Sequence, residues 1–150
     1  GYALGIALTI GLSERANGEN SGLHYNSQAG AFYQAEKEMK KLLQIQGASE
    51  LSECIGFGDL YVTVYGGRTR KIGILLGRGY TYDEAMDILK GVTLESLVVA
   101  RRVIKAVKEM ASLNKVDIKD FPMLMHIDGI LDHNKDAELP WDEFTYEEFK

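Results

Sequence analysis

The sequence predicts an all-α fold of several helices, and three features of its 150 residues support this prediction. Apolar residues recur at helical spacing, Ala, Leu, Glu, Lys and Met fill the long segments, and the chain has only 2 prolines. The composition, 45% hydrophobic and 26% charged, excludes disordered, collagen-like and disulfide-scaffold proteins. A chain of this length forms one domain, or one half of a two-domain protein.

The first predicted helix runs from Tyr2 to about Arg15 and is apolar on nearly all sides. Such a helix is expected to be buried by neighbouring elements. Because a natural chain rarely begins inside a buried helix, we expect residues 1–150 to be the carboxy-terminal fragment of a two-domain protein. The apolar run is shorter than the ~20 residues that a bilayer requires, so no membrane span is expected.

The second helix is predicted to begin at Asn26 or Ser27 and to end near residue 46, where Gly47 follows. Its core stripe is predicted to contain Phe32, Met39 and Leu43, which follow helical spacing.

The next segment is ambiguous. Leu51 and Glu53 suit a brief helix, but periodicity cannot assign residues 55–63, and residues 60–65 could equally form a strand by propensity. A helix over residues 68–76 is then expected to close at the glycines of residues 77–79.

The carboxy-terminal half predicts further helices. Thr81 and Glu84 have the spacing of a capping box, which begins a helix that ends at Gly91. Further helices are predicted over residues 119–131 and 141–149. A continuous apolar stripe predicts a long helix over residues 94–113. The stripe consists of Leu97, Ala100, Ile104, Val107 and Ala111.

Charge and cysteine content limit the partners. The formal net charge of −5 gives no long-range attraction to nucleic acid or to an anionic membrane. The single Cys54 cannot form an internal disulfide, which favours a reducing compartment and predicts a cytoplasmic protein. The three histidines lack zinc-ligand spacing, so no metal site is expected.

Residues 132–143 partly match a calcium-binding loop, since Asp132, Asn134 and Asp136 occupy its first, third and fifth ligand positions and Glu143 its twelfth. Ala137 stands where the loop requires glycine. A solvated turn between helices is therefore the preferred interpretation.

The segment 59–71 carries the strongest functional signal. Asp59 and Thr63 precede a glycine pair, and three cations follow where a helix is expected to begin. Cations at the positive end of a helix dipole cost stability unless an anion offsets them, which predicts an anion site containing Arg68 and Arg70. The alternative is a charged surface turn in which Asp59 pairs with one of these arginines.

These residues also match a family pattern. The match consists of the segments 55–60 (IGFGDL), 62–63 (VT) and 66–71 (GGRTRK), with Glu95 and Ala100 later and NSQA at 26–29. In this pattern the chain resembles the carboxy-terminal domain of the NAD(P)-dependent glycerol-3-phosphate dehydrogenases. The resemblance implies the all-α, multi-helix domain of the 6-phosphogluconate-dehydrogenase-like type, without the amino-terminal Rossmann domain.

The resemblance also implies roles for single residues. Asp59, Thr63, Gly67, Arg68 and Thr69 would bind the substrate, glycerol 3-phosphate or dihydroxyacetone phosphate, with Asp59 supporting a catalytic lysine.

By the same resemblance, Arg68, Thr93 and Glu95 would contact NAD or NADP, and the domain would form a homodimer. The catalytic lysine and the nucleotide-binding domain would lie upstream of Gly1, so the isolated chain is expected to be inactive.

Two departures from the family pattern keep other functions open. Thr69 replaces the usual asparagine, which removes an amide donor, and Gln28 stands where the family usually has lysine. One alternative is therefore a related two-domain dehydrogenase that acts on another hydroxy acid or polyol phosphate. The other is a non-catalytic helical interaction module, with or without a dependence on calcium through residues 132–143.

Overall fold

A computed structural model describes residues 1–18, 25–47, 50–90, 95–133 and 135–144 of the chain. Within these ranges the chain forms α-helices and short 3-10 helices (η) and no strand, which confirms the predicted all-α class. The elements are α1 (Tyr2–Asn17), α2 (Tyr25–Ile45), α3 (Glu50–Gly66), α4 (Arg68–Arg78), α5 (Tyr82–Ile88), α6 (Glu95–Ser112), η1 (Ile118–Asp120), α7 (Pro122–His133) and η2 (Trp141–Glu143).

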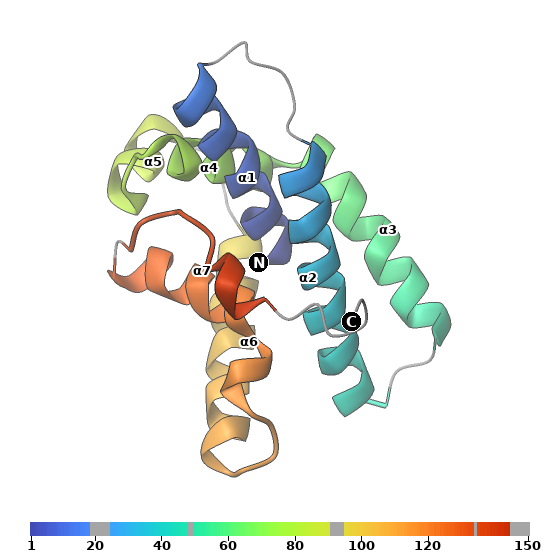
Figure 1. Ribbon diagram of the computed structural model, residues 1–150. Coiled ribbons are helices and arrows are strands. Elements are labelled where there is room, and N and C mark those ends of the chain that lie inside the picture. Colours follow the sequence, from blue (N-terminus) through green and yellow to red (C-terminus); the bar gives the residue numbers. More distant parts are fainter. Residues whose placement is uncertain (19–24, 48–49, 91–94, 134, 145–150) are drawn as a thin grey trace.

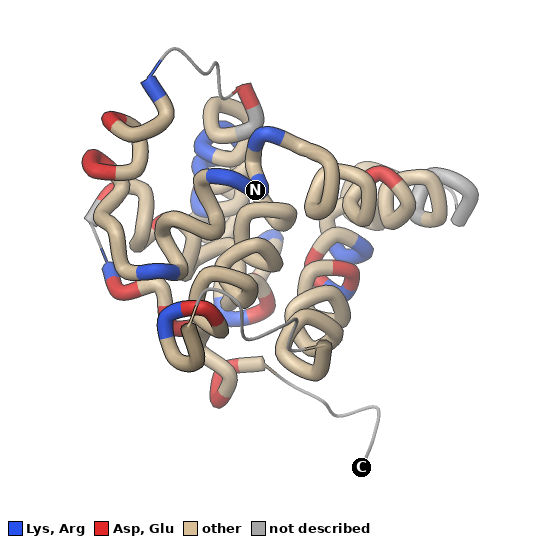
Figure 2. The backbone as a smooth tube through the Cα atoms, turned by 90° about the horizontal axis from the view of Figure 1, so that it is seen from above, with Lys and Arg blue, Asp and Glu red and all other residues tan. Residues whose placement is uncertain are grey.

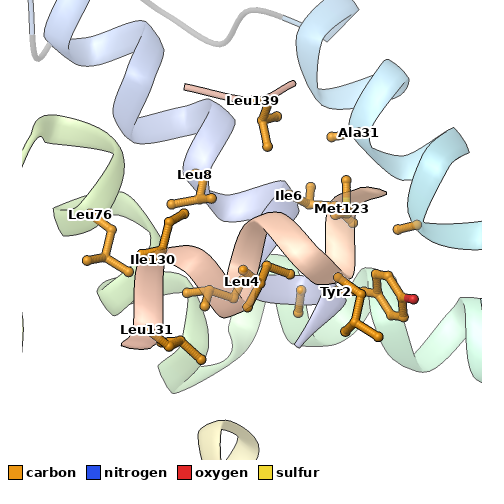
Figure 3. Close-up of a cluster of buried hydrophobic side chains, with 14 of the residues drawn as sticks. Tyr2, Leu4, Ile6, Leu8, Ala31, Leu76, Met123, Ile130, Leu131 and Leu139 are labelled. Atoms are coloured by element: carbon orange, nitrogen blue, oxygen red, sulfur yellow. The ribbon is translucent and has the colours of Figure 1, made fainter. Parts of the chain in front are cut away.

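Helix α1 is the centre of the fold. In Figure 1, α2 and α3 lie on one flank of α1, α4 and α5 lie on the other, and α6 and α7 form a pair beneath them. The first ten residues of α1 are all buried, as the sequence predicted. Figure 3 shows Leu4, Ile6 and Leu8 of this helix packed among side chains of α7 and Leu76 of α4.

Glycines allow α1 and α4 to approach until their backbones touch. A Cβ atom at Gly11 of α1 would overlap the carbonyl oxygen of Ile74, and one at Gly77 of α4 would overlap that of Leu8. Gly73 meets α1 in the same way one turn earlier. Any side chain at these positions would push the two helices apart.

The sequence analysis expected Gly77 and Gly79 to end this helix. Gly77 instead lies within α4. α4 continues to Arg78 and ends at Gly79, which adopts the left-handed conformation at φ 109°. The amide of Gly79 donates to the carbonyl oxygens of Leu75 and Leu76. The prediction at Gly77 was wrong because a glycine required by helix packing looks the same in the sequence as one required by a helix end.

Helix α3 resolves the ambiguous segment. It is one continuous helix from residue 50 to residue 66, so the strand considered for residues 60–65 does not form. Leu60 and Val64, one turn apart, are buried on its inner side, whereas Ile55, Tyr61 and Val62 are exposed. Tertiary packing of the inner side overrides the β-propensity of this sequence.

The buried face of α2 is more polar than predicted. Its buried residues are Gln28, Ala31, Gln34, Ala35 and Glu38. The expected core residues Phe32, Met39 and Leu43 are only partly buried at the edge of this face. Hydrophobic periodicity could not identify the true face because its polar members have hydrogen-bond partners inside the protein.

Glu38 joins α2 to the start of α7. Its carboxylate accepts hydrogen bonds from the Met123 and Leu124 amides at 3.0 and 3.1 Å, from Gln34 Nε2 at 2.7 Å and from the Tyr2 hydroxyl at 3.2 Å. A side chain from another helix thus satisfies amides that α7 cannot satisfy itself. Burial raises the pKa of Glu38 to about 7, although its hydrogen bonds act in the opposite direction.

The later elements follow the prediction with shifted ends. The capping box is confirmed, since the Glu84 amide donates to Thr81 Oγ1 at 3.2 Å and the Thr81 amide donates to Glu84 Oε2 at 2.8 Å. α5 ends at Ile88, before the predicted Gly91, which lies outside the described residues.

Two further boundaries differ. The helix expected over residues 119–131 is divided into η1 and α7, and α7 begins at Pro122, which has no amide hydrogen to donate. The expected helix over residues 141–149 is the short η2 as far as the structure describes it. None of the described helices is both long and apolar enough to cross a membrane.

Replacing the packed glycine by alanine, Gly77→Ala, is expected to lower the free energy of unfolding by roughly 1 to 3 kcal/mol, because the methyl group has no space against α1. The matched control is Gly58→Ala in α3, where a Cβ atom meets nothing within 4 Å. That change should raise the free energy of unfolding by about 0.5 to 1 kcal/mol. Urea unfolding measures both, and equal effects would contradict the packing described for α1 and α4.

The raised pKa of Glu38 predicts how stability depends on pH. Between its ordinary value of 4.5 and about 7, the folded protein retains a proton that the unfolded chain has released. Raising the pH through this range should therefore destabilise wild type, by about 3 kcal/mol relative to Glu38→Gln. Urea unfolding of both proteins across this range tests the prediction. A difference that stays constant, or that grows with pH, would contradict it.

Candidate functional site

The predicted site lies where α3 ends and α4 begins. Gly67 is the single residue between the two helices, and its amide donates to the carbonyl oxygen of Thr63 at 3.1 Å. A Cβ atom at Gly67 would lie 2.6 Å from that same oxygen, so the turn requires glycine. Nothing lies within 4 Å of a Cβ atom at Gly66, so the first glycine of the pair has no such steric role.

Asp59 and Thr63 lie one turn apart on α3, on the approach to this junction. Asp59 is exposed, and its carbonyl oxygen accepts a hydrogen bond from Thr63 Oγ1 at 2.8 Å. The hydroxyl hydrogen of Thr63 is therefore used within its own helix. Toward a ligand, this hydroxyl can accept a hydrogen bond but donates none without breaking the existing one.

The first turn of α4 combines amide groups with cations. Gly67 caps this helix without a side chain, and the first turn contains no acidic residue. Arg68 is exposed and Arg70 is partly exposed. Among the residues that the structure describes, neither arginine forms an ion pair with a carboxylate, so the pairing with Asp59 considered in the sequence analysis is not observed. The first turn thus offers positive charge to an anion.

The remaining predicted residues are less closely grouped. Thr69 is 4% exposed and packs toward the interior, so its backbone amide, at the second position of α4, is its part nearest the helix end. Glu95 is exposed at the first residue of α6. Within the described parts of the chain, α6 packs mainly against α7 and η1 and not extensively against α3 or α4. Thr93 lies outside the described residues.

The first turn of α4 is supported by Tyr65 and Gln28, which the sequence analysis did not assign to the site. The Tyr65 hydroxyl donates to Gln28 Oε1 at 2.7 Å, and the Arg70 guanidinium carbon lies 5.7 Å from the centre of the Tyr65 ring. These contacts join the first turn of α2, the last turn of α3 and the first turn of α4. Gln28 was visible in the sequence only as a departure from the family pattern.

Comparison with known proteins shows the family of the chain. The family described as NAD-dependent glycerol-3-phosphate dehydrogenase C-terminus matches residues 5–141, which is most of the chain. The chain belongs to this family.

Relatives in several organisms are named as glycerol-3-phosphate dehydrogenases. The chain is 37% identical to the NADP(+)-dependent glycerol-3-phosphate dehydrogenase of Archaeoglobus fulgidus over 59% of its own length and 26% of that protein's. It is 31% identical to the glycerol-3-phosphate dehydrogenase [NAD(P)+] of Agathobacter rectalis over 89% of its length, and 31% identical to that of Fusobacterium nucleatum over 88%; each match covers 37% of the relative. The chain thus spans between a quarter and two fifths of these relatives, and no solved structure matches it significantly.

The matched range includes the α3–α4 junction and residues 132–141 of the segment compared with a calcium loop. In that segment Asp132 pairs with Arg101, and Asp136 lies 3.8 Å from Arg15. These two carboxylates thus have separate cationic partners, whereas Asn134 lies outside the described residues. No group of three or more His, Cys, Asp or Glu side chains in the described ranges could hold a metal ion.

Acidic and basic residues are mixed in the described parts of the chain away from the α3–α4 junction, as Figure 2 shows. A groove at the opposite end of α4 contains Arg15 and Arg78, but it also contains Glu14, whose Oε2 atom is 2.6 Å from Arg78 Nε. The first turn of α4 differs from this groove in having cations without acidic neighbours in its own sequence.

Proposed function

We propose that this chain is the substrate-binding domain of an enzyme that interconverts sn-glycerol 3-phosphate and dihydroxyacetone phosphate with NAD or NADP. The family match supports the reaction class. The observation that carries the assignment of the site is the first turn of α4, where Arg68 and Arg70 have no carboxylate partner among the described residues. A phosphate group supplies the negative charge that this arrangement lacks.

The substrate phosphate would bind at the start of α4. The backbone amides of residues 68–70 are the groups that a helix start leaves without internal acceptors, and they can donate to phosphate oxygens. The Arg68 guanidinium adds charge-assisted hydrogen bonds, and Gly67 leaves the approach to these amides open. Phosphate binding there would hold the substrate by its unreactive end and so orient the carbon that reacts.

Asp59 and Thr63 would serve the other end of the substrate. The exposed Asp59 carboxylate can hold a cationic group or accept a hydrogen bond from a hydroxyl, and Thr63 Oγ1 can accept another. Asp59 would thus support the catalytic lysine that the family resemblance expects. The nicotinamide cofactor supplies or receives the hydride, and Arg68, Glu95 and Thr93 are the residues of this chain proposed to contact it.

The proposal also covers the domain organisation, the oligomeric state and the cellular location of the protein. We propose a nucleotide-binding domain upstream of Gly1, for which the relatives' greater length leaves room, and also a homodimer and a cytoplasmic location.

A related substrate is the second candidate, because Thr69 buries its side chain where the family pattern has asparagine. A panel of hydroxy acids and polyol phosphates tests this candidate. Faster turnover of one of these than of glycerol 3-phosphate would favour it.

In the two-domain protein, Arg68→Ala should lower kcat/KM for dihydroxyacetone phosphate by an amount equal to about 2 to 4 kcal/mol of transition-state stabilisation. The loss follows from the missing charge and hydrogen bonds at the phosphate. The rate of NADH or NADPH oxidation measures it. Arg102→Ala, which removes an exposed cation from α6, is the matched control and should leave kcat/KM unchanged.

Two results would contradict the proposal in different ways. Near-normal kcat/KM in Arg68→Ala would remove Arg68 from the site. No oxidation of either cofactor by folded wild-type protein would mean that the family supplies the fold but that this chain does not serve this reaction.

A further inference from the structure

We propose that Tyr65 is a positioning residue of the phosphate site: held by Gln28, its ring fixes Arg70 as a second cation for the bound anion. The proposal deepens the proposed function and rests on it. It defines how Arg70, which the sequence pattern already places in an anion site, is held in position, and it gives Tyr65 and Gln28 roles that neither the family match nor the sequence pattern assigns to them.

Gln28 anchors the hydroxyl end of Tyr65. The Gln28 side chain is 3% exposed, and its Oε1 atom accepts the Tyr65 hydroxyl hydrogen at 2.7 Å. If the ring turned away, a buried amide oxygen would lose this partner, which proteins avoid. Burial also raises the pKa of Tyr65, so its hydroxyl remains a hydrogen-bond donor at neutral pH. The ring is thus fixed at its polar end.

Neighbouring aromatic rings fix its other sides. The centre of the Tyr65 ring lies 4.9 Å from that of Tyr61 and 6.2 Å from that of Phe32. The Arg70 guanidinium lies over the Tyr65 ring, at 5.7 Å from the guanidinium carbon to the ring centre. A guanidinium over an aromatic ring keeps its N–H groups at the edge of the contact, where they can still donate to another group.

The direction of Arg70 places its charge on the correct side of the helix. Arg70 is the third residue of α4, and helical side chains lean toward the amino-terminal end of their helix. Tyr65 belongs to the last turn of α3, so the Arg70 contact with its ring holds the guanidinium on the α3 side of the α3–α4 junction. There it lies near the same helix end as the amides that would bind phosphate.

A purely structural contact is the competing explanation, in which Arg70 only ties α4 to α3. The two explanations differ in one respect. A structural tie affects stability equally with and without a ligand, whereas a positioned cation changes the affinity for an anion and the dependence of that affinity on salt. Affinity and stability must therefore be measured on the same variants.

The experiment titrates the two-domain protein, which contains residues 1–150 together with its nucleotide-binding domain, with sn-glycerol 3-phosphate and, separately, with inorganic phosphate. Amide chemical shifts of residues 67–71 in nuclear magnetic resonance spectra report binding. Arg70→Gln is expected to raise the Kd about tenfold and to weaken its salt dependence. Arg70→Lys should restore part of the affinity, since it returns the charge without the planar guanidinium. Arg102→Gln, on α6, is the control and should not change the Kd.

A double-mutant cycle tests the role of Tyr65. Tyr65→Leu should raise the Kd by about as much as Arg70→Gln in wild type, and should add nothing when Arg70 is already Gln. Tyr65→Phe keeps the ring and removes the bond to Gln28, so its effect should be intermediate. Circular dichroism shows whether Tyr65→Leu folds. If it does not, Tyr65→Phe is the variant that tests the role of Tyr65.

The outcomes separate this inference from the proposed function. Effects of Tyr65→Leu and Arg70→Gln that simply add, or an unchanged Kd in Arg70→Gln while Arg68→Gln raises it, would overturn the inference alone. If wild type binds neither ligand at residues 67–71, both proposals fail. Tighter binding of glycerol 3-phosphate than of inorganic phosphate identifies the phosphate ester as the preferred source of the anion.

Discussion

The close contact between α1 and α4 determines where the proposed site can be. Gly11, Gly73 and Gly77 let the backbones of the two helices touch, so the axis of α4 is fixed against the most buried element of the fold. The first turn of α4 must then emerge beside the end of α3, with only Gly67 between them. A rigid helix whose start is fixed in this way can hold an anion without ordering a loop, which lowers the entropic cost of binding.

A second constraint holds the other side of the core together. The Glu38 carboxylate reaches from α2 to the start of α7 and also accepts a hydrogen bond from Tyr2 of α1. A carboxylate in the interior is costly, and here hydrogen bonds from backbone amides and side chains offset part of that cost, although burial still raises the pKa of Glu38 to about 7. Because α2 also carries Gln28 behind Tyr65, the packing of α2 links the core to the proposed phosphate site.

The sequence was informative where one physical rule acts alone. The apolar stripe of α6, the uniformly apolar α1 and the capping box at Thr81 each follow from local pattern, and each is present in the structure. It was misleading where tertiary contacts decide. Gly77 packs against α1 instead of ending α4, and α3 is helical despite its β-branched and aromatic residues.

The candidate site could likewise be predicted only in part from the sequence. The group from Asp59 to Lys71 could be recognised because its glycines and cations are consecutive in the sequence. In the structure residues 66–71 form the α3–α4 junction, and Asp59 lies about two helical turns before it. The burial of Thr69 and the support from Tyr65 and Gln28 could not be predicted, because they depend on how three separate helices meet. Contacts between side chains of different helices leave no periodic pattern in the sequence, so sequence periodicity cannot predict them.

A crystal structure of the chain with bound sn-glycerol 3-phosphate tests the central claim most directly, because it locates the phosphate without depending on activity. Our account predicts phosphate oxygens within hydrogen-bond distance of the amides that begin α4 and of the Arg68 guanidinium. Phosphate in the groove of Arg15 and Arg78 at the opposite end of α4, with the first turn of α4 left free, would contradict it.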